Sequence, residues 1–163
     1  MKHRKTIKQA AQTIPVCKGQ TYELQIDRLG TSGEGVGRYE NFTVFVPNAL
    51  PGETVSILIE EVKNSYARGR IKQILHESVD RVAPLCELYE ECGGCQLQHF
   101  SYEAQLRAKR AQVADALTHI GKLSQIPVQE TLRAEEPWNY RNKMQFPIGR
   151  SSGKIVIGCF AQG

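Results

Sequence analysis

Hydrophobic and polar residues alternate along the first half of the chain, in short stretches separated by glycine and proline. The stretches lie at 22–26, 42–46, 55–59 and 66–75. A period of two residues is typical of strands that bury one face, and the second stretch is rich in β-branched and aromatic residues. Closely spaced short strands predict a small closed barrel of about five strands within residues 14–76.

A glycine-rich sequence, Gly33-Glu-Gly-Val-Gly-Arg38, follows the first of these stretches. It resembles a phosphate-binding loop, but the Lys-Ser/Thr pair of a P-loop is missing and no helical pattern follows it. We therefore expect a glycine-rich strand that bends tightly to close the barrel.

The period changes from two to that of a helix after residue 100. Ser101 can cap a helix that extends to about residue 120, and Gly121 suits the position after its C-terminus. The side chains expected on its packed face are Leu106, Val113, Leu117 and Ile120. Those expected mainly at its solvated surface are Arg107, Lys109 and Arg110.

After Pro127 the pattern indicates β structure again. A loop at 135–138 leads into residues 139–146, and a turn at 151–154 precedes the apolar stretch 155–160. Within these segments we expect Trp138 and Cys159 to be core residues. The overall fold class is thus mainly β with one helix: a five-stranded barrel at 14–76, then a partial α+β domain at 77–163.

Three cysteines form the most distinctive motif of the chain. Cys86, Cys92 and Cys95 have the spacing C-x5-C-x2-C, with Gly93-Gly94 in the short gap. Such a set of thiolates favours a soft metal centre, either an iron–sulfur cluster or zinc, and both usually take four ligands. The two glycines allow positive φ angles, so that the backbone can curl and direct N–H groups at sulfur.

Charge is unevenly distributed. Residues 1–13 carry four basic groups and no acid, and we expect them to be a disordered basic tail. The barrel region is balanced and the cysteine loop is acidic, whereas residues 100–163 hold nine basic groups against five acids. An RNA partner would therefore meet the tail and the C-terminal third, and the acidic loop is not a phosphate site.

Tyr140-Arg141-Asn142-Lys143 is the best candidate for a nucleic-acid contact. Arg and Lys neutralise phosphate, Tyr can stack on a base, and Asn can read a base edge. The alternative is the polar edge of a strand.

Composition limits the cellular setting. No apolar run has the length of a membrane span, and the basic N-terminus lacks the apolar segment of a signal peptide. Cysteines gathered in a metal-type motif indicate a reducing compartment. We expect a cytoplasmic protein without a membrane partner, and no protein partner is evident.

Several motifs together resemble one family. They are Cys-x5-Cys-Gly-Gly-Cys-Gln-Leu-Gln-His, the glycine-rich sequence at 33–38, Val-Phe-Val-Pro-Asn-Ala-Leu-Pro-Gly-Glu at 44–53, and Tyr-Arg-Asn-Lys at 140–143. From residue 16 to 163 the chain resembles RNA uracil-5-methyltransferases that act on 23S rRNA. The resemblance implies that the barrel is a TRAM domain, an OB-like RNA-binding fold. It also implies that Cys86, Cys92 and Cys95 hold a [4Fe–4S] cluster, with the fourth ligand beyond residue 163 and Cys159 as the local substitute.

The chemistry of that family is only partly represented here. Methylation of uracil C5 needs a thiolate that adds at C6, a carboxylate that removes the C5 proton, and a pocket for S-adenosylmethionine. No strand is followed by the glycine-rich turn and helix of such a pocket. We therefore expect the N-terminal part of an S-adenosylmethionine-dependent methyltransferase of 23S rRNA, inactive by itself.

Two other classes are weighed against this one. A stand-alone RNA-binding module with a zinc knuckle would have no catalytic role. A methylthiotransferase also combines a TRAM barrel with a cluster, but its cysteines are spaced C-x3-C-x2-C, which the motif here does not match.

Overall fold

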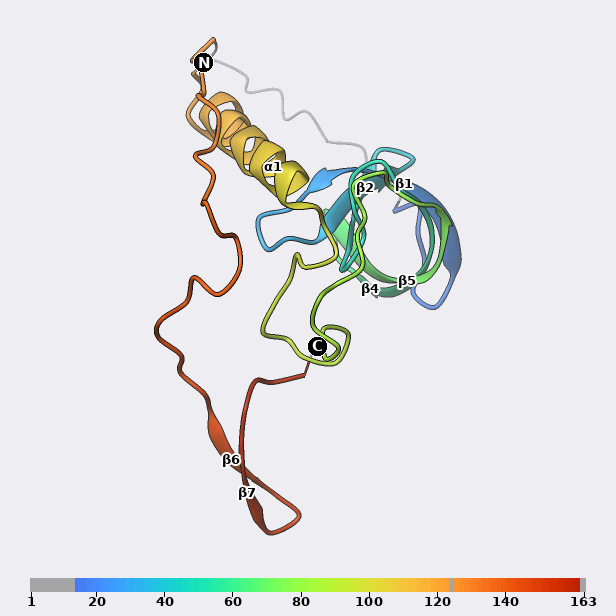
Figure 1. The fold of residues 1–163 in the computed structure, drawn as a ribbon. Coiled ribbons are helices and arrows are strands. Elements are labelled where there is room, and N and C mark those ends of the chain that lie inside the picture. Colours follow the sequence, from blue (N-terminus) through green and yellow to red (C-terminus); the bar gives the residue numbers. More distant parts are fainter. Residues whose placement is uncertain (1–13, 124, 162–163) are drawn as a thin grey trace, which may run out of the picture.

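The structure is a computed structural model that describes residues 14–123 and 125–161. The expected basic tail, 1–13, lies outside the described residues. Within them, the first five strands close into a barrel, which confirms the predicted architecture (Figure 1). These strands are β1 (Thr21–Leu29), β2 (Gly35–Tyr39), β3 (Phe42–Val46), β4 (Thr54–Val62) and β5 (Tyr66–His76).

The barrel closes by one parallel pairing among antiparallel ones. Its strand order is β1-β2-β3-β5-β4, with β1 next to β4, and β3 and β5 run parallel. Side chains alternate between buried and half-buried along β3 and the first part of β4, as the period of two predicts, whereas three consecutive residues of β2 are buried. The core is formed by buried aliphatic residues, among them Leu24, Ile26, Val44, Val46, Val55, Ile57 and Ile59. Burial of each contributes roughly 1.5–3 kcal/mol.

The glycine-rich sequence lies in the barrel wall, in and just before β2. A Cβ atom at Gly37 would lie 2.2 Å from the carbonyl oxygen of Gln25, and one at Gly35 would lie 2.7 Å from that of Ala49. Neighbouring backbone therefore occupies the space a side chain would need, which confirms the barrel-closing interpretation.

The predicted helix is present. Helix α1 (Tyr102–Asp115) begins after Ser101, whose hydroxyl accepts a hydrogen bond from the Ala104 amide at 3.4 Å. It continues into a short π-helical segment, η1 (Ala116–Ile120), which Gly121 follows.

The packed face of the helix differs from the prediction. Ala104 is buried against a small cluster that contains Leu29, Leu50 and Phe100, whereas the side chains of Val113 and Ile120 are 51% and 83% exposed. Helix α1 projects away from the barrel, so that the face chosen by hydrophobicity has little to pack against in the described chain (Figure 1). Proximity to the barrel, rather than apolar character, selected the buried face.

The C-terminal third forms an extended arm. Residues 125–147 contain no helix or strand, and β6 (Ile148–Ser151) pairs with β7 (Lys154–Ile157) in a hairpin distant from the barrel (Figure 1). The predicted turn at 151–154 is confirmed. Residues 139–146 are irregular rather than β, and Trp138 and Cys159 are exposed, so their expected core positions were wrong. A two-stranded hairpin supplies too little surface to build a core.

Candidate nucleic-acid and metal-binding site

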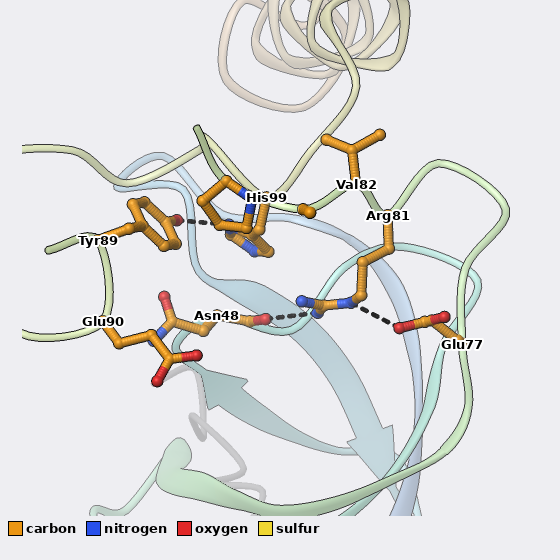
Figure 2. A pocket seen from close by; sticks show the side chains of 9 residues that line it. Asn48, Glu77, Arg81, Val82, Tyr89, Glu90 and His99 are labelled. Carbon is orange, nitrogen blue, oxygen red and sulfur yellow. Dashed lines mark hydrogen bonds and ion pairs between the residues drawn. The ribbon is translucent and has the colours of Figure 1, made fainter. Parts of the chain in front are cut away.

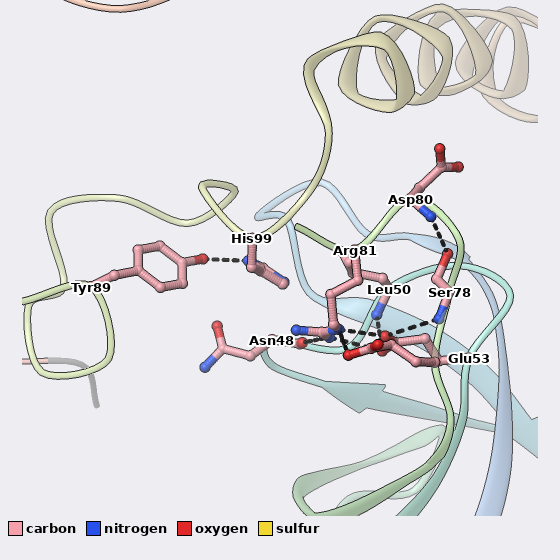
Figure 3. Close-up of polar contacts among 9 residues, drawn as sticks. Asn48, Leu50, Glu53, Ser78, Asp80, Arg81, Tyr89 and His99 are labelled. Atoms are coloured by element: carbon pink, nitrogen blue, oxygen red, sulfur yellow. Dashed lines mark hydrogen bonds and ion pairs between the residues drawn. The ribbon is translucent and has the colours of Figure 1, made fainter. Parts of the chain in front are cut away.

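A buried ion pair joins the barrel to the cysteine loop. Glu53, just before β4, is fully buried, and Arg81, after β5, donates to its Oε1 and Oε2 at 2.6 and 2.9 Å (Figure 3). The Leu50 amide donates to Oε2 at 2.9 Å, and Arg81 also donates to the Asn48 carbonyl at 2.8 Å. Every oxygen of the carboxylate is thus bonded, as a buried charge requires.

The environment of Glu53 keeps it ionised. Burial acts to raise the pKa of this carboxyl group, but the hydrogen bond and positive charge of Arg81 oppose it, with help from the Leu50 and Ser78 amides. The net result is a pKa below the ordinary value. The pair therefore remains charged at neutral pH.

A second polar contact lies beside this pair. His99 is buried, and its Nδ1 bonds to the hydroxyl of Tyr89, which also donates to the Gln96 carbonyl at 2.9 Å (Figure 3). Burial, followed by the charge of Arg81, lowers the pKa of His99 to about 4. The imidazole is therefore neutral at pH 7.

A cavity of about 560 Å³ opens between the barrel and the cysteine loop. Arg81, Tyr89 and His99 line it together with the carboxylates of Glu77 and Glu90 (Figure 2). Since Arg81 is already bonded to Glu53, the uncompensated charge around the cavity is negative. This agrees with the expectation that the acidic loop is not a phosphate site.

The cysteine loop is closed at its base and irregular in its interior. Arg81 pairs with Phe100 in an isolated bridge, and the Val82 amide donates to the His99 carbonyl at 3.0 Å. Cys86 and Cys95 are exposed and Cys92 is partly exposed. Within the described residues, no three cysteine, histidine or acidic side chains converge into a metal-binding group. The three motif thiols are brought onto one loop but not onto one point.

One of the predicted N–H contacts to sulfur is present, but the glycines achieve it differently. The Gly94 amide donates to Sγ of Cys92 at 3.4 Å. Neither Gly93 nor Gly94 has a positive φ, so the loop does not use the freedom that glycine allows. A Cβ at Gly93 would lie 3.0 Å from the carbonyl oxygens of Phe160 and Ala161. The close approach of the chain end, not backbone curvature, requires glycine here.

Cys159 lies at that same end of the described chain, beside Cys92. Its thiol is hydrogen-bonded to Cys92, which raises the pKa of Cys159, and the positive charge of Arg141 acts in the opposite direction. Sequence reasoning had placed Cys159 in a core and named it only as a substitute ligand. Its neighbours in the sequence are apolar, which is why a core position was expected. No local signal points to its contact with Cys92.

The four candidate RNA-contacting residues lie together on the arm. Tyr140, Arg141, Asn142 and Lys143 are all exposed, in an irregular segment rather than at a strand edge. Tyr140 is 71% exposed, and Arg141 contacts Sδ of Met144 at 3.8 Å. The segment thus offers an aromatic ring, an amide and two cations to solvent.

Other basic side chains are largely engaged with acids or backbone. Arg107 forms two bonds of 2.7 and 2.8 Å with Asp80, and Arg70 pairs with Glu60 at 2.9 Å. Arg110 donates to the Val128 carbonyl at 2.9 Å. These contacts favour structural roles for the helix cations.

Sequence reasoning missed the Glu53–Arg81 pair and the Tyr89–His99 contact as features of the site. A signal for both was present. Glu53 ends the distinctive sequence at 44–53, and His99 ends the cysteine motif. A histidine and an acid at the ends of such motifs were candidates for buried polar contacts, but nothing local named Tyr89 or Arg81 as their partners.

Comparison with known proteins agrees with the architecture. The family model of the TRAM domain matches residues 15–72. This part of the chain is therefore similar to a TRAM domain. The match covers nearly all of the barrel, whose last strand, β5, ends a few residues beyond it.

Similar proteins extend the likeness beyond the TRAM domain. An uncharacterized RNA methyltransferase of Clostridium tetani is 49% identical over 91% of this chain, and one of Halalkalibacterium halodurans is 42% identical over 93%. One of Listeria monocytogenes is 46% identical over 88%. The chain spans about a third of the length of each, 32%, 33% and 31% respectively.

One solved structure is similar to part of this chain. The solution structure of a conserved protein of Methanococcus maripaludis is 35% identical, covers 40% of this chain and 94% of its own, and has a TM-score of 0.37. Among the described residues, no helix combines the length and apolar character needed to cross a membrane.

Proposed function

We propose that this chain is the RNA-binding and cluster-carrying part of an S-adenosylmethionine-dependent methyltransferase that methylates uracil C5 in 23S rRNA. The observation that carries the proposal is the similarity of about nine-tenths of the chain to RNA methyltransferases of which it spans a third. The TRAM match supports an RNA partner. The finer assignment to uracil C5 and 23S rRNA rests on the resemblance of the cysteine loop and its companion motifs.

The arm is the proposed RNA-contacting element. Arg141 and Lys143 would neutralise phosphates, Tyr140 would stack on an unpaired base, and Asn142 would bond to a base edge. All four are exposed in the structure. The acidic rim of the cavity, Glu77 and Glu90, would repel phosphates and keep the RNA backbone away from the cysteine loop.

Cys86, Cys92 and Cys95 are the proposed ligands of a [4Fe–4S] cluster. The residue types are those that such a group takes: three thiols on one loop, with the Gly94 amide bonded to sulfur. Binding would draw together thiols that do not converge among the described residues. When bound, the cluster would cross-link three points of a loop that otherwise lacks regular structure. Its role would be to order the loop, and the Arg81–Phe100 bridge would transmit that order to helix α1 and the barrel.

The proposal is tested on the parent protein that carries this chain, purified without oxygen. We expect iron and sulfide bound in stoichiometric amounts, and transfer of labelled methyl from S-adenosylmethionine to uracil C5 of 23S rRNA. A colourless protein with zinc and no iron would favour the zinc-knuckle module instead. Methyl transfer to a different RNA or a different atom would contradict the substrate assignment.

The 163-residue chain alone is expected to bind no S-adenosylmethionine and to transfer no methyl group. The described chain holds a barrel, a helix and a hairpin, and it contains no β-α-β crossover for a donor pocket. Calorimetry with S-adenosylmethionine measures the first expectation and labelled transfer the second. Specific one-to-one binding would reveal a donor site that the fold does not explain.

A further inference from the structure

The end of the described chain is paired with the middle of the cysteine loop. The Gly93 amide donates to the Phe160 carbonyl at 2.8 Å, and Cys92 and Ala161 form an antiparallel bridge. Figure 1 shows the chain returning from the β6–β7 hairpin to this loop. Backbone bonds therefore hold two segments together that are far apart in the sequence.

This pairing brings two sulfur atoms to one place. A Cβ atom built at Gly94 would lie 3.3 Å from Sγ of Cys92 and 3.3 Å from Sγ of Cys159. Glycine at this position leaves the space between backbone and sulfurs open. Any side chain there would press on both thiols, so Gly94 is a condition for their contact.

Both thiols can be reached by a small oxidant. Cys159 is exposed and Cys92 partly exposed, and no disulfide joins cysteines in the part of the chain that the structure describes. Cys17, by contrast, lies in the segment before β1, and Cys86 and Cys95 occupy other exposed positions on the loop.

We propose that Cys92 and Cys159 form a reversible disulfide when the protein meets a peroxide. The thiolate of one cysteine attacks a peroxide oxygen and becomes a sulfenic acid, with water as the leaving group after protonation. The thiol of the other then attacks that sulfur, the S–S bond forms, and a second water leaves. Two thiols and one hydrogen peroxide thus give one disulfide and two waters, and a dithiol reductant reverses the step.

The cross-link has a consequence for the metal centre, and this part rests on the proposed function. Cys92 in a disulfide is no longer a thiolate ligand, so oxidation would remove one of the three loop ligands. It would also fix the chain end covalently to the loop. The disulfide itself requires only the metal-free chain, so its test is independent of the cluster.

The experiment is peptide mapping of the metal-free 163-residue chain after mild treatment with hydrogen peroxide, without reduction. Cleavage after lysine and arginine leaves all three loop cysteines on the peptide 82–107, and Cys159 on the peptide that begins at residue 155. We expect these two peptides to be joined, and to separate after reduction. A bond between Cys92 and Cys95 would leave them separate and would overturn the proposal.

Variants identify the partners. Cys92→Ser and Cys159→Ser should each abolish the joined peptides, whereas Cys86→Ser, Cys95→Ser and Cys17→Ser should leave their yield unchanged. Treatment in denaturant should also lose the product, because only the folded chain holds these two residues together. Equal joining in denaturant, or loss of the product in Cys95→Ser, would contradict the assignment. The peptide map of the unchanged chain shows whether the two peptides are joined even if a variant misfolds.

Discussion

Two buried polar side chains, Glu53 just before β4 and His99 in the cysteine loop, lie near the same arginine in opposite electrostatic states. Glu53 is held as an anion by Arg81, whereas His99 is held neutral beside the same arginine. Arg81 therefore acts on both groups. Its removal should affect the barrel and the loop together.

Arg81→Ala is expected to destabilise the protein by about 3–5 kcal/mol, because it leaves the buried Glu53 carboxylate without its counter-charge. The matched control is Arg107→Ala, which breaks an exposed pair with Asp80 and should cost at most about 1 kcal/mol. Urea unfolding curves of the two variants measure both values. Equal losses of stability in the two variants would show that the buried Glu53–Arg81 pair contributes no more than an exposed ion pair.

Stability should fall as the pH is lowered from 6.5 towards 4. The pKa of His99 drops from 6.5 to about 4 on folding, so in this window the unfolded chain binds the proton and the folded chain does not. The stability that depends on neutral His99 is fully present above pH 6.5, is lost as the pH falls towards 4, and amounts to at most about 3 kcal/mol.

His99→Gln should flatten this part of the stability–pH profile, while His119→Gln, at an exposed position on η1, should leave it unchanged. Denaturant unfolding at closely spaced pH values gives the profile. A slope that persists in His99→Gln would assign the effect to other groups.

At the scale of elements, the strands of the barrel depend on close backbone contact and the arm does not. Gly37 lies where β1 and β2 meet, and Gly158 lies just after β7 with open space around its Cα. The two glycines therefore differ in what a methyl group would encounter. Comparing them separates the packing of the barrel from a general effect of glycine.

Gly37→Ala is expected to destabilise the barrel by about 3 kcal/mol or more, because the added Cβ would lie 2.2 Å from the Gln25 carbonyl oxygen. Gly158→Ala should change stability by less than about 1 kcal/mol, since a Cβ there meets nothing within 4 Å. Thermal unfolding followed by circular dichroism measures both. If Gly37→Ala were as stable as the unchanged chain, β1 and β2 could move apart to admit the methyl group without loss of stability.

At the scale of the whole molecule, charge and exposure distinguish the barrel from the arm. The barrel is neutral overall, and Arg70 on its surface pairs with Glu60. The C-terminal third has an excess of basic groups, with Arg141 and Lys143 exposed on the arm. The arm is therefore the stronger electrostatic partner for RNA.

Arg141→Ala is expected to weaken RNA binding and to lower the slope of log affinity against log salt by about 0.7–0.9, as the loss of one phosphate contact does. Arg38→Ala, on β2 of the barrel, should leave affinity and slope close to those of the unchanged chain. Titrations with an rRNA fragment at several salt concentrations measure both slopes. If only Arg38→Ala weakened RNA binding, the phosphate contact would lie on the barrel and not on the arm.

Local pattern by itself determined the strands of the barrel, the helix and its Ser101 cap, and the turn at 151–154. These depend on residues close together in the chain, where period and capping act directly. The cysteine motif was equally visible, because its spacing is local. The glycines of β2 could be assigned to barrel closure because the lack of a Lys-Ser/Thr pair excluded the alternative.

Tertiary structure alone decided the buried face of α1, the Glu53–Arg81 pair, and the approach of Cys159 to Cys92. Each joins residues separated by tens of positions, and the pattern around each residue is compatible with several partners. The exposed apolar residues of helix α1 and of the arm show the same limit. Hydrophobicity predicts that Val113 or Trp138 will be buried, but burial requires a second surface, and only the three-dimensional arrangement of the chain determines whether one is present.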